Sequence, residues 1–295
     1  MAAFDDIVEA IKAGGCILFL GAGVHYPPKD NDPVYGGCYP ASEQPPLGRG
    51  LADILAADCK FLDDPDFSQG EKESISSNLQ RISLYYEINK SRPDLTAAVR
   101  KAVSDDKQPS RAVRALAELD FPIICTTNYD KLFEIALFKA NKLPVVASYS
   151  RDKFAITQDY KSAMLNPRKP FLFKIHGDID DASDSMVITD EDYIHFILRM
   201  INGKGQNDPI PKAFRYYVSL LPILFVGFSL MDYNLRLLFK ILGWEIENPK
   251  QSYSIGPYPD GLIKQKYDPP VKFIAQDVWK FVPELYQAVK GVPMP

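Results

Sequence analysis

The sequence has few cysteines, and it lacks the spacing that would organise them into a metal site. The four cysteines, Cys16, Cys38, Cys59 and Cys125, form no C-x-x-C pair, so a structural zinc site has no support. Cys16 and Cys125 lie in apolar runs and are expected as buried thiols. Because nothing in this pattern requires an oxidising compartment, the cytoplasm is the expected location.

An excess of positive charge and a long apolar run are also missing. The 34 Lys and Arg residues are outnumbered by 38 Asp and Glu, which gives a net charge of −4, so direct nucleic-acid binding is not expected. The N-terminus lacks the basic and apolar regions of a signal peptide. The longest uncharged stretch, residues 216–231, is shorter than the roughly 20 residues of a spanning helix, and we expect no membrane segment.

Short apolar runs alternate with amphipathic segments along the 295 residues. Continuous apolar runs of this length are typical of strands buried on both faces of a parallel sheet. Strands are expected at residues 16–20, 123–125, 171–175, 223–228 and 271–274. Helices are expected at residues 4–12, 110–119, 190–202 and 277–291, after Lys131 and after Asp232. The alternation predicts a doubly wound α/β fold with a mostly parallel sheet.

Two regions interrupt this alternation. Residues 26–50 contain six prolines and four glycines, which excludes a regular helix, and a loop of this length is usually functional. Residues 51–115 contain amphipathic helical patterns, and we expect them to form a small helical module. The module is expected to be inserted within a single domain that covers residues 1–295.

Polar and glycine-rich clusters follow four of the expected strands, where ligands bind in open α/β sheets. Each cluster has a simpler explanation as a tight turn or a helix cap. His25 borders the first cluster and could also belong to a site. Tyr26 stands where the G-x-G-x-x-G fingerprint needs its third glycine, and no P-loop motif occurs, so a dehydrogenase and a P-loop NTPase are disfavoured. The clusters are Gly21-Ala22-Gly23, Thr126–Asp130, His176-Gly177-Asp178, and Gly227-Phe228-Ser229 with Asp232.

Together these motifs resemble the sirtuin-like NADase family, and more closely its branch in bacterial anti-phage defence, which includes the NADase domain of the Thoeris effector. The likeness spans about residues 4–290 and implies a Rossmann-like domain that binds NAD as its substrate. The matching segments, in the order of the family, are GAGV at 21–24, TTNYDKLFEIAL at 126–137, KIHGDID at 174–180, TDEDY at 189–193 and VGFSLMDYNLR at 226–236.

The resemblance also implies which residues form the site. Asn128 and His176 match the catalytic pair of the family, and Asp130 matches an acid near the nicotinamide amide. The serine that usually follows GAGx is His25 here, and the four-cysteine zinc ribbon of the protein deacylases is missing, which disfavours an acyl-lysine substrate. No metal is expected. The implied NAD-binding residues are Gly21, Ala22, Gly23, Thr127, Gly227, Ser229 and Asp232.

The chemistry of NAD cleavage suits these residue types. Nicotinamide leaves the ribose as a neutral molecule, so the general acid of ordinary glycosidases is unnecessary. We expect Asn128 to hydrogen-bond the ribose or the attacking water. His176, with a pKa near the ordinary value of about 6.5, would accept a proton from that water or from a ribose hydroxyl. The products would be nicotinamide and ADP-ribose, with cyclised products left open.

Two other functions stay open at this point. The chain could be a regulatory or scaffold subunit that binds NAD or ADP-ribose, or a nuclease that holds Mg²⁺ on Asp130, Asp178, Asp180 and Asp232. The nuclease is disfavoured because acidic residues are common helix caps and the chain is not basic. Expected partners are further copies of the chain, as a homo-oligomer, and a DNA-translocating ATPase or an Argonaute-like chain.

Overall fold

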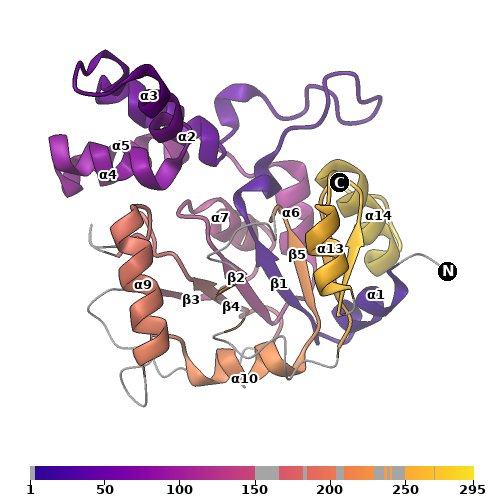
Figure 1. Ribbon diagram of the computed structural model, residues 1–295. Helices are drawn as coiled ribbons and strands as arrows, with labels where there is room; N and C mark the ends of the chain where they lie inside the picture. The colour runs from indigo at the N-terminus through magenta and orange to yellow at the C-terminus, as the bar shows by residue number, and fades with distance from the viewer. Residues whose placement is uncertain are drawn as a thin grey trace.

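The computed structural model describes residues 4–149, 166–181, 185–203, 209–228, 236–237, 240, 250–268 and 270–295 (Figure 1). Within these residues, seven strands form one parallel sheet in the order β3-β4-β2-β1-β5-β6-β7. All five predicted strands are confirmed, and two short ones, β3 and β6, are additional. The strands are β1 (Ile17–Leu20), β2 (Ile123–Thr126), β3 (Val145–Ser148), β4 (Phe171–Lys174), β5 (Ile223–Val226), β6 (Ser252–Ile255) and β7 (Val271–Ile274).

The register of the central strands brings their carboxyl ends into one row. Leu20 pairs with Thr126 on one side and with Val226 on the other, and Thr126 pairs with Lys174. The chain builds β2, β3 and β4 on one side of β1 and then returns to place β5, β6 and β7 on the other. The order of strands therefore reverses between β1 and β5, and a ligand site is expected at such a point.

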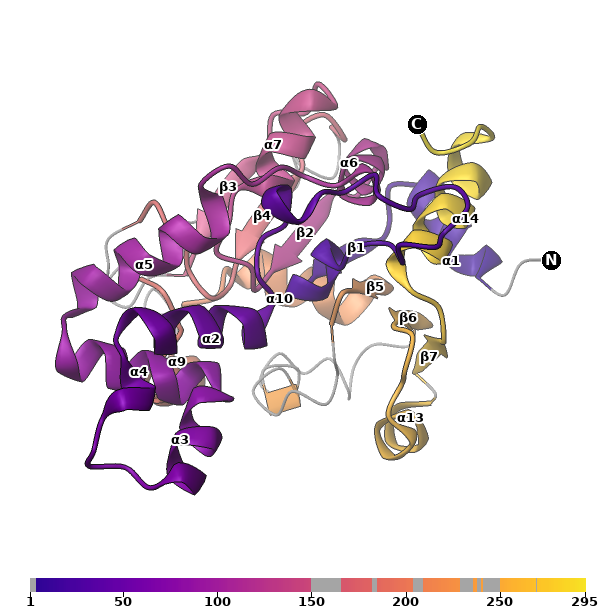
Figure 2. The ribbon, with the colours of Figure 1, turned by 90° about the horizontal axis from the view of Figure 1, so that it is seen from above.

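Helices cover both faces of the sheet (Figure 2). Alternate strand residues explain the continuous apolar runs: Leu18 and Leu20 face one apolar cluster, and Ile17 and Phe19 face the other. The first face is covered by α1 (Asp5–Lys12), α6 (Arg111–Glu118), α7 (Leu132–Lys139) and α14 (Val278–Lys290). The second is covered by α9 (Asp190–Asn202), α10 (Lys212–Leu220) and α13 (Gly261–Tyr267).

A helical module lies beyond the carboxyl edge of the sheet (Figure 1). Its helices share an apolar cluster of their own, around Leu55, Ile82 and Leu95. Ile179 and Ile188, which follow β4, pack into the same cluster and join it to the sheet. Residues 111–115, which were expected within the module, lie in α6, and α6 packs on the sheet. The module comprises α2 (Gly48–Asp58), η3 (Phe61–Asp63), α3 (Gln69–Ser76), α4 (Leu79–Asn89) and α5 (Arg92–Ser104).

The Pro-rich loop runs from the sheet to this module. One short 3-10 turn, η1 (Ala22–His25), precedes the loop, a second, η2 (Ala41–Glu43), lies within it, and α2 begins at Gly48. The indole Nε1 of Trp279 donates to the carbonyl of Tyr26 at 2.7 Å, which fixes the start of the loop to α14. None of the described helices is long and apolar enough to cross a membrane.

Candidate active site

The glycine loop after β1 packs backbone against backbone on the loop after β5. The amide of Gly21 donates to the carbonyl of Val226 at 3.0 Å, and that of Gly23 donates to the carbonyl of Gly227 at 3.0 Å. A Cβ on Gly21 would lie 2.5 Å from the oxygen of Gly227, so only glycine permits this approach. Two of the amides expected to hold phosphate therefore already donate to the neighbouring strand. Ala22 lies between them, at the start of η1.

The loop after β2 is tied to β1 through its threonines. The Thr126 hydroxyl donates to the carbonyl of Leu20 at 3.0 Å and accepts the amide of Asn128 at 3.0 Å. The amide of Thr127 donates to the same carbonyl of Leu20 at 3.3 Å. These bonds fix the backbone from which the half-buried Asn128 projects.

His25 meets both Asn128 and Asp130, although more than 100 residues separate it from them. Its Nε2 lies 3.4 Å from Asn128 Nδ2 and 3.5 Å from Asp130 Oδ2. The other carboxylate oxygen of Asp130 accepts the amide of Leu132 at 2.8 Å and caps α7. Burial raises the pKa of Asp130, but the nearby His25 and Lys174 lower it further, so the pKa lies below its ordinary value. Asp130 is thus an ionised residue that holds His25 and caps a helix.

His176 follows β4 and is enclosed by aromatic rings from α9. The hydroxyl of Tyr193 lies 3.5 Å from His176 Nδ1, and the rings of Tyr193 and Phe196 meet the imidazole edge-on. Burial lowers the pKa of His176 to about 4, well below the ordinary value expected from the sequence. The imidazole is therefore neutral at pH 7 and able to accept a proton.

Lys174, at the end of β4, joins the loops that carry the two expected catalytic residues. Its side chain is fully buried and donates to the carbonyls of Tyr129 at 3.0 Å and Asp130 at 2.7 Å. It also lies 3.1 Å from the carboxylate of Glu134 and 2.9 Å from that of Asp178. Sequence reasoning missed this role. The available signal was a lysine at the end of an apolar strand, where a charge requires partners.

The described acidic residues expected for a nuclease, Asp130, Asp178 and Asp180, each lie beside a basic side chain. Asp178 lies 2.8 Å from the amine of Lys131 and 2.9 Å from that of Lys174. Asp130 pairs with His25, and Asp180 lies 3.4 Å from Lys131. In the described parts of the chain, no group of three His, Cys, Asp or Glu residues could hold a metal ion. These pairings further disfavour a Mg²⁺-dependent nuclease.

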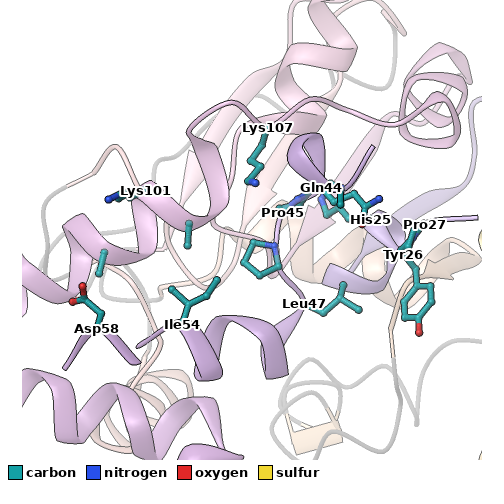
Figure 3. Close-up of a pocket in the computed structure, with 14 residues that line it drawn as sticks. His25, Tyr26, Pro27, Gln44, Pro45, Leu47, Ile54, Asp58, Lys101 and Lys107 are labelled. Carbon is teal, nitrogen blue, oxygen red and sulfur yellow. The ribbon is translucent and has the colours of Figure 1, made fainter. Parts of the chain in front are cut away.

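Two cavities flank His25 and the glycine loop. One has a volume of about 720 Å³ and extends from His25 between the Pro-rich loop and the module to Asp58 and Lys101 (Figure 3). The other, of about 540 Å³, begins at Gly23 and Gly227 and extends over the ends of β6 and β7. Tyr26 and Pro27 line both cavities and so stand between them.

The predicted site residues are thus gathered at one edge of the sheet. Asn128 and His176 each follow a strand by two residues, and those strands pair in register. Neither of them is among the described residues that line the two cavities, and His176 is only 7% exposed. Ser229 and Asp232 lie outside the described residues.

A parallel α/β sheet whose strand order reverses between β1 and β5 defines the doubly wound, Rossmann-like class of fold. A family model described as a SIR2-like domain matches residues 122–274, just over half of the chain. The chain belongs to this SIR2-like family, and the resemblance expected from the motifs is confirmed.

Individual relatives agree with this family. NAD(+) hydrolase ThsA of Enterococcus faecium is 31% identical over 254 residues, which cover 84% of this chain and 44% of the relative. Defense-associated sirtuin 2 of Bacillus subtilis is 28% identical over 133 residues, or 44% of this chain and 11% of the relative. A solved mutant Sir2 homologue in complex with ADP-ribose matches 97% of this chain and 96% of its own, with 13% identity and a TM-score of 0.45. The chain spans less than half the length of these curated relatives.

Proposed function

We propose that this protein is an NAD glycohydrolase, which cleaves the bond between nicotinamide and ribose to give nicotinamide and ADP-ribose. The observation that carries the proposal is the position of Asn128 and His176, each two residues after one of two paired strands, beside the β1–β5 switch point. The relative named NAD(+) hydrolase ThsA, which aligns with 84% of this chain, supports the same reaction.

The charge states of the site residues bear on this chemistry. His176 is neutral at pH 7 because burial lowers its pKa to about 4, so its ring can accept a hydrogen bond from a ribose hydroxyl or from water, although it is a weaker base than an ordinary histidine. Asn128 offers an amide that hydrogen-bonds the ribose or the attacking water. The leaving nicotinamide needs no proton, which agrees with a site whose described carboxylates are engaged by basic side chains. Asp130 acts by holding His25 and the start of α7.

The two cavities support a binding mode that spans the glycine loop. Cavities of about 300–1,000 Å³ hold ligands of this size class. The 540 Å³ cavity beside Gly23 and Gly227 would take the ADP half of NAD, and the nicotinamide end would extend past Tyr26 toward His25. Because Gly21 and Gly23 already donate to the loop after β5, binding of the pyrophosphate by their amides requires that loop to move. Thr127, Ala22, Ser229 and Asp232 complete the proposed NAD-binding set.

We further propose a biological setting in which NAD depletion defends a bacterial cell against phage. The likeness to the defence branch of the family and the relative named defense-associated sirtuin 2 support this role. The proposal includes a cytoplasmic location, self-association, and activation by a partner such as a DNA-translocating ATPase or an Argonaute-like chain.

Nicotinamide release from NAD by the purified chain tests the reaction. We expect Asn128→Ala and His176→Ala each to lower turnover by about 10²- to 10⁴-fold, the effect typical of lost acid–base or hydrogen-bonding groups. His195→Ala is the matched control, because His195 is an exposed histidine on α9, and it should keep wild-type turnover. The assay should cover several protein concentrations, with and without genomic-neighbour proteins. Wild-type turnover in either site variant would remove that residue from the mechanism.

A binding subunit without turnover is the second candidate, and the closed state of the site favours it. His176 is only 7% exposed, so the isolated chain could bind ADP-ribose without reaching a reactive geometry. Calorimetric binding of NAD and ADP-ribose, with no nicotinamide release under any of the conditions above, would select this function over hydrolysis.

A further inference from the structure

One polar group in the site has no hydrogen-bond partner among the residues that the structure describes. The Nδ1 atom of His25 is buried and makes no hydrogen bond with any residue that the structure describes. The side chain is only 3% exposed, whereas its Nε2 has two polar neighbours. An unpaired buried polar atom costs about 1–3 kcal/mol, so a histidine kept in this state calls for an explanation.

The two neighbours of Nε2 make opposite demands on it. The carboxylate of Asp130 at 3.5 Å requires a proton on Nε2, whereas the amide nitrogen of Asn128 at 3.4 Å requires a lone pair there. One nitrogen cannot meet both demands. Asp130 is ionised even beside a neutral His25, because the nearby charge of Lys174 and the Leu132 amide, which donates to the carboxylate at 2.8 Å, favour the charged form, and a hydrogen bond to a charged group is roughly twice as strong as a neutral one.

The proton therefore belongs on Nε2, and the Asn128 amide has to adapt. An amide oxygen and an amide nitrogen occupy nearly the same volume, so rotation of the side chain by 180° replaces one by the other. Oδ1 of Asn128 then shares the single Nε2 hydrogen of His25 with the Asp130 carboxylate as a bifurcated hydrogen bond, and the NH₂ group of Asn128 is directed away from His25. Nδ1 of His25 is left as a bare acceptor, the less costly form of an unpaired ring nitrogen in a neutral imidazole.

We propose that His25 is a positioning residue for Asn128. Asp130 fixes the imidazole with its proton on Nε2, and that proton fixes the Asn128 amide with its NH₂ group available to the ligand. The inference rests on the proposed function for its kinetic consequence, but the orientation itself does not depend on turnover. It also gives a role to the histidine that replaces the expected serine after the glycine loop.

Nitrogen NMR of the imidazole rings tests the orientation directly. The full chain contains three histidines, so ¹⁵N labelling of histidine gives few signals, and His176→Gln and His195→Gln assign them. We expect a proton on Nε2 of His25 at pH 7, and we expect Asp130→Asn to weaken that preference. A ring with its proton on Nδ1 and a bare Nε2 would overturn the proposal, whether or not the chain cleaves NAD.

Paired substitutions test the consequence for turnover. In His25→Gln, the side-chain amide can reach the position of Nε2 and keep a donor there, whereas in His25→Asn the shorter amide takes the position of Nδ1. We expect His25→Asn and His25→Ala to lower kcat by about 10- to 100-fold, the effect of one lost buried hydrogen bond. His25→Gln should recover most of kcat. The dissociation constant for ADP-ribose should stay within about twofold in all three.

The double variant His25→Ala/Asp130→Asn separates coupling from independent damage. If His25 and Asp130 act as one unit, the double variant should lose no more kcat than the worse single variant. The assignment would be contradicted if the losses of kcat multiplied in the double variant or if His25→Gln and His25→Asn had equal turnover. It would also be contradicted if the main effect were weakened binding of ADP-ribose. A wild-type chain that releases no nicotinamide would refute the proposed function while the NMR result still decides the orientation.

Discussion

Two buried polar clusters lie beneath the same loop, Thr127–Asp130, and they differ in how completely they are paired. Lys174 contacts two backbone carbonyls and two carboxylates at 2.7–3.1 Å. His25 has two neighbours at 3.4–3.5 Å and one ring nitrogen without any described partner. The first cluster is saturated and holds the backbone, whereas the second retains hydrogen-bonding capacity for a ligand.

The largest loss of folding stability is expected when the lysine is removed from the saturated cluster around Lys174. In Lys174→Met, the carboxylates of Glu134 and Asp178 lose a fully buried cation. The loss of one partner from a buried ion pair typically costs about 3–5 kcal/mol. Urea unfolding should show this loss, while Lys139→Met, at an exposed position on α7, should change stability little. A loss in Lys174→Met no larger than in the control would show that the network is not a scaffold.

A smaller loss of stability is expected at acidic pH, because His176 becomes protonated when the chain unfolds. Its folded pKa of about 4 lies below the unfolded value of about 6.5. Between these values the unfolded chain binds more protons, so stability is full above pH 6.5 and falls as the pH drops toward 4, by up to about 3 kcal/mol. Asp130 and Asp178 have lowered pKa values, so their contributions are lost only at still lower pH. The same slope in His176→Gln would contradict this assignment.

The smallest loss of folding stability is expected at Lys131, at the edge of the saturated cluster. Lys131 lies 2.8 Å from Asp178, but its side chain is 35% exposed. Solvent screens such a pair, so Lys131→Met should cost at most about 1 kcal/mol. This variant sharpens the comparison because Lys131 and Lys174 contact the same carboxylate but differ in burial and in the two backbone carbonyls to which Lys174 donates. Equal losses in the two variants would show that burial is not the deciding factor.

Most of the strands and helices could be predicted, because each is indicated by a pattern of neighbouring residues. The apolar runs at Ile17–Leu20 and Ile223–Val226 are strands as expected, and Asp277 caps α14, which ends before Gly291. The short strands Val145–Ser148 and Ser252–Ile255 have weaker signals, because their polar residues interrupt the apolar pattern.

The individual site residues could be predicted from the sequence, but most of the contacts between them could not. Strand ends predicted where Asn128 and His176 would stand, but the approach of His25 to Asp130 depends on the pairing of β1 with β2. The lowered pKa of His176 depends on α9, which closes over the imidazole with Tyr193 and Phe196. Contacts between distant segments of this kind leave no pattern in the surrounding sequence.

The bonds from Lys174 to main-chain carbonyls have a consequence for how this loop can change during evolution. A carbonyl is present whatever side chain a residue carries, so the bond from Lys174 to position 129 places no demand on the side chain there, although the Tyr129 hydroxyl itself donates to the carbonyl of Val187 at 2.7 Å. Glu134 and Asp178 have no such freedom, because their side chains balance the lysine charge. Substitutions at Lys174 are therefore expected to arise together with changes at these two acids.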